Sequence, residues 1–344
     1  MIEFSLMDSL THIVLGACIG ELILDKQAGR KAVLWGALAQ SVPDIDFVAG
    51  MWMPVSTELL AHRGITHSFL FAFLSAFFLA LIAARWHKAE PISLRKWFWF
   101  FLIEIGCHLL LDAMNNYGIG WFEPFTSQRI SFNVLYVADP LFSMVALVSF
   151  LFLLFSKTDH KHRLKWARVG VFVSVIYLCF ALYNKYTIEN KVQEDLKKMG
   201  VVSNRYFTTP TLLNNFLWFV AIEDTAGYHI GYRSILDKDI QMRTSYFPKN
   251  ENLLNPVHDH KEVMELKTFS QGYYTVEHWG DTLVFNDLRF GQTNGWEDPK
   301  SKFAFHYYLS HPTDNDLIVQ RGRFAKFNQA SAWMMWNRIL GEQY

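Results

Sequence analysis

Cysteine and net charge are both scarce in this sequence of 344 residues. The three cysteines, Cys18, Cys107 and Cys179, lie inside apolar runs, so there is no disulfide framework, no CxxC pair and no cysteine zinc site. Lys and Arg together equal Asp and Glu at 32 each, which offers no basic surface to nucleic acid. Walker, GxGxxG and GxSxG motifs are also missing. What remains is an apolar chain, 51% hydrophobic and 19% charged, which excludes disordered and coiled-coil classes.

Long apolar runs fill the first half of the chain and predict a membrane domain over residues 1–184. Four runs approach the ~20 residues that a spanning helix needs; they cover residues 65–84, 97–113, 140–156 and 169–184. Two shorter segments, 10–24 and 32–42, precede them as a hairpin or re-entrant pair. The start of the chain up to Asp8 has no basic residue, so we expect no cleaved signal peptide. The prediction is an α-helical polytopic domain with four to six membrane segments.

Residues 185–344 read as a soluble domain. A charged amphipathic helix over 185–199 leads out of the membrane, and the pattern then changes to short aromatic and β-branched runs typical of strands. We expect strands at 216–222, 228–236, 273–278, 283–285 and 303–310, and helices at 259–269 and 328–341. The prediction is a small α+β domain built on an antiparallel sheet.

The basic residues of the first half orient the membrane segments. Twelve of its 14 Lys and Arg lie in loops 25–31, 85–96 and 157–168, whereas the alternate loops contain only Arg63 and Arg129. Short loops rich in Lys and Arg stay on the cytoplasmic side. We therefore expect a multi-pass protein of the cytoplasmic membrane, with residues 185–344 extracytoplasmic.

On this topology, four His and four Asp from separate parts of the membrane half fall on the outer side: His12, Asp44, Asp46, His62, His67, His108, Asp112 and Asp139. His108 and Asp112 are four residues apart, on one helix face, as two ligands of one ion must be. Glu104 extends that face one turn deeper, where its carboxylate could hold the ring of His108. Taken singly, these residues are also common as interfacial His and as Asp beside Pro in turns. Their gathering on one side favours a metal site.

The donor set suggests which ions such a site would take. Neutral imidazole and carboxylate oxygen suit zinc first, with manganese or iron as alternatives, and the lack of thiolate disfavours a purely structural zinc. Eight candidates exceed the four ligands of one tetrahedral site and would suffice for two ions. One or two divalent metal ions are therefore predicted.

The same residues resemble a known family. The resemblance is carried by four sequence motifs: Met7 to His12, Pro43-Asp44-Ile45-Asp46, His62-Arg63-Gly64-Ile65-Thr66-His67-Ser68, and His108 to Asp112 followed by Asn115, Asn116, Tyr117 and Gly118. In order and spacing they are similar to the YdjM-like membrane-bound metal-dependent hydrolases over about residues 7–155, and the long tail resembles the YfhP-type branch. The resemblance implies an integral membrane protein with a hydrolase site, in which His12, Asp44, Asp46, His62, His67, His108 and Asp112 are motif positions.

These observations predict an integral membrane hydrolase whose metal centre activates water toward a lipid or lipid-linked ester or phosphoester. Arg63 is placed to hold a phosphate, and Asp46 or Asp139 to act as general base. The partners expected are the bilayer and a lipid-like substrate. The alternative is a non-catalytic membrane regulator or sensor with a structural metal and a partner-binding extracytoplasmic domain. Transport fits poorly, because apart from Glu104 the ionisable residues stop at one face.

Overall fold

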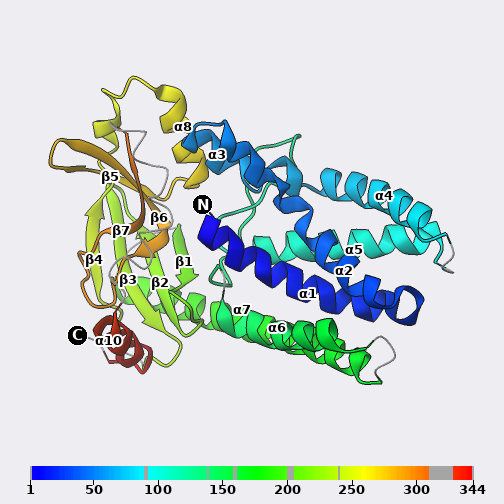
Figure 1. Cartoon of the computed structure of the whole chain (residues 1–344). Coiled ribbons are helices and arrows are strands. Elements are labelled where there is room, and N and C mark those ends of the chain that lie inside the picture. Colours follow the sequence, from blue (N-terminus) through cyan, green and yellow to red (C-terminus); the bar gives the residue numbers. More distant parts are fainter. Residues whose placement is uncertain are drawn as a thin grey trace.

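A computed structural model of the chain describes residues 2–88, 92–137, 139–157, 161–199, 205–238, 241–309 and 328–342. The N-terminal part is mostly helical, and we call it the helical bundle; the C-terminal part, residues 205–342, is a β-sheet domain that we call the soluble domain. The helices of the bundle extend away from the soluble domain, which covers one end of them (Figure 1). They are α1 (Ile2–Ala28), α2 (Arg30–Ser41), α3 (Val55–Ala61), α4 (Phe69–Trp86), α5 (Leu94–Ala113), α6 (Pro140–Phe155) and α7 (Arg163–Met199).

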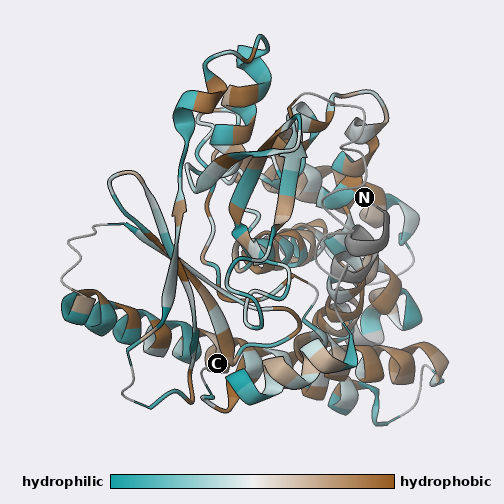
Figure 2. Cartoon of the chain, turned by 90° about the vertical axis from the view of Figure 1, so that its left-hand side faces the viewer, coloured by the Kyte–Doolittle hydropathy of each residue, from teal (hydrophilic) through white to brown (hydrophobic). Residues whose placement is uncertain are grey.

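Each of the four long apolar runs forms a helix, α4, α5, α6 or α7, and the two shorter segments lie within α1 and α2. Within the described residues, two helices are long and apolar enough to cross a membrane, Phe69–Trp86 and Arg163–Met199. Ser9–Leu24 and Pro140–Phe155 are shorter apolar helices. Figure 2 shows long hydrophobic stretches along helices of the molecule.

Small residues let the helices of the bundle pack closely. The buried positions of α4 are all alanines, namely Ala72, Ala76, Ala80 and Ala83, and they face the large buried side chains of α5 such as Trp97 and Phe101. α1 and α2 cross even more closely, because a Cβ atom at Gly36 would lie 2.0 Å from the carbonyl oxygen of Gly16. A side chain at either glycine would force the α1–α2 hairpin apart.

Helix α7 connects the bundle to the soluble domain without a break, so the expected boundary at residues 184 and 185 falls inside one helix of 37 residues. Its last turns present Ile188, Val192 and Leu196, spaced by four residues, to the first sheet. These side chains pack against strand β2 (Leu217–Glu223), whose residues 217–222 are buried on both faces. The amphipathic pattern of 185–199 is therefore explained by packing on a sheet.

The soluble domain contains two antiparallel sheets rather than the single sheet expected. The first has the order β1 (Tyr206–Pro210), β2, β3 (Gly227–Ser234) and β4 (Thr244–Pro248); the second has the order β5 (Tyr274–Trp279), β6 (Thr282–Gln292) and β7 (Phe303–Tyr308). Helices α8 (His260–Phe269) and α10 (Gln329–Ile339) and the turn η3 (Glu251–Leu254) complete it. All five predicted strands and both predicted helices are present; residue 310, the predicted end of β7, lies outside the described residues, and β1 and β4 were not expected.

At the other end of the bundle, a buried ion pair joins α1 to the start of α7. The Arg163 guanidinium donates to both carboxylate oxygens of Glu21, at 2.7 and 2.8 Å, and also to the carbonyl of Leu153 at 2.7 Å. Both charged side chains are no more than 4% exposed. Removal of either partner would leave an uncompensated charge in an apolar environment.

We expect Arg163→Ala to destabilise the protein by about 3–5 kcal/mol, because Glu21 would remain buried and ionised without a partner. Lys267→Ala, which breaks the exposed pair with Glu251, is the control and should cost less than about 1 kcal/mol. Unfolding of the detergent-purified protein by SDS titration measures both. Equal losses in the two variants would contradict a stabilising role specific to the buried pair.

Candidate metal centre

Four side chains converge at the end of the bundle that faces the soluble domain: Asp44, His67, His108 and Asp112. Asp44 comes from η1 (Pro43–Met51), the turn that follows α2, and His67 ends η2 (Ile65–His67) directly before α4. Ser68 caps α4 by accepting a hydrogen bond from the N–H of Phe71 at 3.1 Å, which fixes the position of the preceding histidine. The other two residues share one face of the last turns of α5.

Five of the six distances among the ligand atoms of these residues are close to those of a tetrahedral site, and all four atoms lie within 4.8 Å of one another. Nε2 of His67 and Nε2 of His108 are 3.1 Å apart. Oδ1 of Asp44 lies 3.5 Å from each of these nitrogens, and Oδ2 of Asp112 lies 3.2 Å from the first and 3.5 Å from the second. A tetrahedral zinc with bonds of about 2.0–2.1 Å separates its ligand atoms by about 3.3–3.4 Å. The residues therefore fit one divalent ion.

Burial makes this cluster costly without a cation. His67 and His108 are fully buried and Asp112 is 1% exposed, while the side chain of Asp44 is 21% exposed. Two imidazole nitrogens that face each other at 3.1 Å cannot both bear a proton without repulsion, whereas both can donate a lone pair to one ion. Burial raises the pKa of the Asp44 carboxyl, but the adjacent His108 and His67 outweigh it and hold that pKa below its ordinary value. Asp44 is thus ready to bind a cation and is the ligand closest to solvent.

Asp46 supports the site from one layer further out. Its Oδ2 lies 3.4 Å from Nδ1 of His67 and accepts a hydrogen bond from the backbone N–H of Arg63 at 2.7 Å. A carboxylate at Nδ1 keeps the proton there and leaves the Nε2 lone pair for the metal. Burial raises the pKa of Asp46, but His62 and His67 outweigh it and lower the pKa below its ordinary value. The structure therefore places Asp46 behind His67, not among the four converging atoms.

His12 and Arg63 hold the second oxygen of Asp112. His12 Nε2 lies 3.2 Å and Arg63 Nη2 lies 3.0 Å from Oδ1 of that carboxylate. Because Oδ1 is engaged, Oδ2 is directed toward the two imidazoles. The ring of His12 also packs on the ring of His108, with centroids 3.9 Å apart. His12 joins the site as a neighbour of two ligands.

The guanidinium of Arg63 contacts Asp112 through Nη2, and the Arg63 side chain is 3% exposed. Its backbone has φ of 58°, a left-handed conformation that is uncommon for a residue other than glycine. Gly64, which follows, has φ of −86° and ψ of −123°, also outside the main regions of other residues, and the N–H of Arg63 donates to Asp46. His62, the residue before it, contacts Asp46 through Nδ1 at 3.3 Å and is 25% exposed, outside the four converging side chains.

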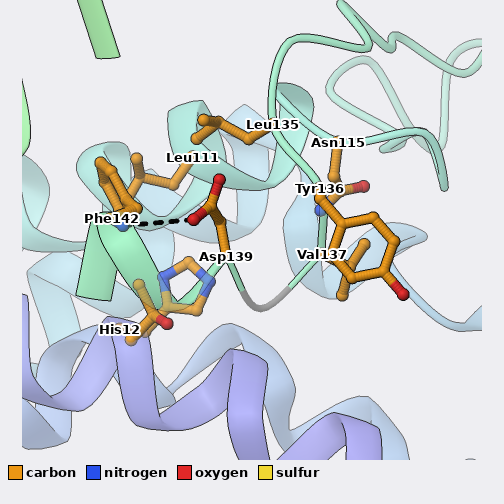
Figure 3. Close-up of a pocket in the computed structure, with 9 residues that line it drawn as sticks. His12, Leu111, Asn115, Leu135, Tyr136, Val137, Asp139 and Phe142 are labelled. Atoms are coloured by element: carbon orange, nitrogen blue, oxygen red, sulfur yellow. Dashed lines mark hydrogen bonds between the residues drawn. The ribbon is translucent and has the colours of Figure 1, made fainter. Parts of the chain in front are cut away.

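Asp139 lies apart from the cluster, in a pocket next to His12. It caps α6 by accepting hydrogen bonds from the N–H groups of Leu141 and Phe142, and the hydroxyl of Tyr177 donates to its other oxygen at 2.8 Å. Figure 3 shows its carboxylate above the ring of His12. The pocket is lined by Thr11, His12, Leu111, Asn115, Leu135, Tyr136, Val137, Asp139 and Phe142. Burial raises the pKa of Asp139 despite these hydrogen bonds, which suits a group that exchanges a proton.

Among the described residues, no hydrogen bond joins Glu104 to the ring of His108, in contrast to the sequence-based expectation. Its Oε2 accepts a hydrogen bond from the amide of Gln40 at 3.1 Å, and both residues are fully buried. Within the described part of the chain, Oε1 of Glu104 and Nδ1 of His108 have no hydrogen-bond partner. The pattern of ionisable residues in the sequence does not predict Gln40 as the partner of Glu104, because an amide carries no charge. The hydroxyl of Thr66 lies 3.0 Å from Nδ1 of His67.

Comparison with known proteins now identifies the family. The profile of the YdjM inner membrane protein family matches residues 7–188, more than half of the chain. The chain belongs to this family. It is also 30% identical over 122 residues to the inner membrane protein YbcI of Escherichia coli (strain K12), a match that covers 35% of this chain and 69% of YbcI. No solved structure shows a significant match. This chain is thus a membrane protein of the family, and the match ends before the first strand of the soluble domain.

We expect metal binding to require each of the four converging side chains, and loss of a supporting neighbour only to weaken it. We expect His67→Ala and Asp112→Ala to lose stoichiometric metal, since each removes a ligand atom. His62→Ala should keep the metal with an affinity about 10–100-fold lower, because His62 acts through Asp46. Elemental mass spectrometry and chelator competition on purified protein measure the two quantities. Complete loss of metal in His62→Ala would instead place His62 among the ligands.

Metal affinity should rise with pH. Burial lowers the pKa of His67, but its hydrogen bonds with Asp112 and Asp44 outweigh this and raise the pKa to about 9. Since the ion must displace that proton, the apparent association constant should increase about tenfold per pH unit between about pH 6 and pH 8. Zn²⁺ titrations across this range test it, and an affinity that does not change with pH would contradict it.

The stability of the metal-free protein, in contrast to its metal affinity, should fall as the pH rises. The folded-state pKa of His67 lies above its ordinary value of 6.5, so the stability from its carboxylate contacts is complete below that pH and is lost as the pH rises through about 9. Thermal unfolding of the metal-free protein across the same range reports this loss.

Proposed function

We propose that the protein is a membrane-bound metal-dependent hydrolase. The observation that carries the proposal is the set of two imidazole nitrogens and two carboxylate oxygens, with one ligand, Asp44, partly open to solvent. A set of two nitrogens and two oxygens suits zinc first, and manganese or iron as alternatives. Four converging side chains account for one ion; the arrangement of Asp46, His62 and His12 around them is that of supporting residues.

The membrane placement that we propose follows from the bundle and its loops. α4, α5, α6 and α7 would span the bilayer, with α1 and α2 as a shorter hairpin, which gives four to six segments. The loops that are rich in Lys and Arg lie at the end of the bundle opposite the soluble domain (Figure 1). Because such loops stay in the cytoplasm, the metal centre and the soluble domain would lie on the extracytoplasmic side.

This location supports a lipid or a lipid-linked ester or phosphoester as substrate. A centre at the end of the spanning helices meets the polar headgroups, where the scissile bond of such a substrate lies. A bound ion would lower the pKa of water toward about 7 and polarise the oxygen of the scissile bond.

Of the predicted general bases, Asp139 fits the role better than Asp46. The carboxylate of Asp46 is held by His67, His62 and the backbone of Arg63. Asp139 lines the pocket beside His12, and burial raises its pKa above the ordinary value, in the direction that favours a general base. Arg63 would act by balancing the charge of Asp112.

The direct test is turnover of defined lipids in water enriched in oxygen-18. Purified protein loaded with Zn²⁺ would be incubated in mixed micelles with phosphatidic acid and with phosphatidylglycerol, and products would be identified by mass spectrometry. We expect a cleaved product that carries one oxygen from water. His108→Ala should abolish turnover, and Asp139→Asn should slow it by about 10²–10⁴-fold with the metal content unchanged. Turnover that persists in His108→Ala would refute the proposal.

One observation favours the alternative of a non-catalytic membrane regulator: the four protein ligands form a closed shell, as structural metal sites do. A closed shell has no exchangeable water, whereas the hydrolase requires one. Water proton relaxation of the Mn²⁺-loaded protein distinguishes the two. Absence of an exchangeable water together with absence of turnover would support the regulator.

A further inference from the structure

The loop that follows α5 is fastened to the soluble domain by a buried arginine. Arg289 of β6 is fully buried and donates to both carboxylate oxygens of Asp287, at 3.1 and 2.6 Å, so its position is fixed. It also donates to the carbonyl oxygens of Asn116 at 3.1 Å and Tyr117 at 3.2 Å, and the amide of Asn116 donates back to the carbonyl of Arg289 at 2.6 Å. This reciprocal pairing fastens residues 116–117 to β6, the middle strand of the second sheet.

The ring of Tyr117 spans from the soluble domain to the residues that support the metal ligands. On one side it packs against Phe290, with ring centroids 4.9 Å apart. On the other side the guanidinium of Arg63 lies 5.1 Å from its centroid, and the ring of His62 lies 6.1 Å away. Arg63 holds Asp112 and His62 contacts Asp46. The ring of Tyr117 therefore links β6 to Asp112 through Arg63 and to Asp46 through His62.

Two further contacts keep this geometry fixed. Arg129 donates to the carbonyl oxygens of Leu60, His62 and Gly118 at 2.9, 2.7 and 2.9 Å, which ties the loop after α3 to the loop after α5. α3 itself is held by α8, because the hydroxyl of Ser56 donates to Glu265 at 2.7 Å. The supporting residues of the metal centre are thus connected to the soluble domain in two ways, through Tyr117 and through α3.

We propose that the soluble domain is a clamp on the metal centre, in which Arg289 and Tyr117 are positioning residues for Asp112 and Asp46. The family match ends at residue 188, so Arg289 lies outside the part of the chain that matches the family, whereas Tyr117 lies inside it. The proposal rests on the metal binding of the proposed function and is independent of hydrolysis. Its consequence is regulatory: a ligand of the soluble domain that shifts β6 changes the metal affinity.

The test compares two buried arginines of the same domain. Arg289→Leu removes the contacts with the loop, whereas Arg338→Leu removes an equivalent bidentate pair with Asp237 that lies away from the loop. Zn²⁺ affinity of the full-length protein is measured by competition with a chromogenic chelator, and the fold by thermal unfolding. We expect Arg289→Leu to weaken Zn²⁺ binding about 10–100-fold and Arg338→Leu to leave it unchanged, although both lower stability. Equal effects on Zn²⁺ affinity in the two variants would overturn the clamp.

A second pair of variants keeps the test valid if Arg289→Leu fails to fold. Tyr117→Leu removes the ring between Phe290 and Arg63 and should weaken Zn²⁺ binding, while Tyr117→Phe retains the ring and should restore it. Unchanged affinity in Tyr117→Leu would overturn the clamp. Because the readout is Zn²⁺ affinity, failure to hydrolyse any lipid would refute only the hydrolase, whereas a wild-type protein that binds no Zn²⁺ would refute the metal centre and the clamp together.

Discussion

The carboxylate of Asp112 is the charge on which the site depends. It is 1% exposed in the last turns of an apolar helix, so it must be compensated from every direction. His12 and Arg63 meet one of its oxygens, and His67 and His108 meet the other. These partners come from α1, from the turn before α4 and from α5 itself. The need to pair this one buried charge therefore brings together segments that are up to 100 residues apart in the sequence.

The sequence was informative where the periodicity of a helix or the cost of burial decides the outcome. The spacing of His108 and Asp112 placed both on one helix face, and their convergence with Asp44 and His67 agrees with the expected gathering of polar residues at one end. The sequence alone could not distinguish the metal ligands from the residues that support them. His12, His62 and Asp46 carry the same chemistry as the four converging side chains, and only the distances to Asp112 and His67 set them one layer out.

The strands show the same limit for the fold. β6 runs from Thr282 to Gln292, yet only 283–285 was expected, because Asn286, Asp287 and Arg289 interrupt its apolar pattern. These polar residues are fully buried, and the last two pair with each other. Their partners cannot be seen in local sequence, since Arg289 also binds the backbone of residues 116 and 117. Asp287 and Arg289 thus interrupt the strand pattern because they form the contact between the soluble domain and the bundle, whereas Asn286 pairs with β5.

Charge balance explains why a divalent cation suits this place. With neutral histidines, the carboxylates of Asp44, Asp46 and Asp112 and the guanidinium of Arg63, which contacts Asp112, sum to two negative charges. Protonation of His67, whose pKa rises to about 9, offsets one of them. A divalent ion between the two imidazoles offsets both and replaces the proton. Tyr117 packs on Arg63 on one side and on Phe290 of β6 on the other, so in the proposed clamp the soluble domain also holds the guanidinium that contributes to this charge balance.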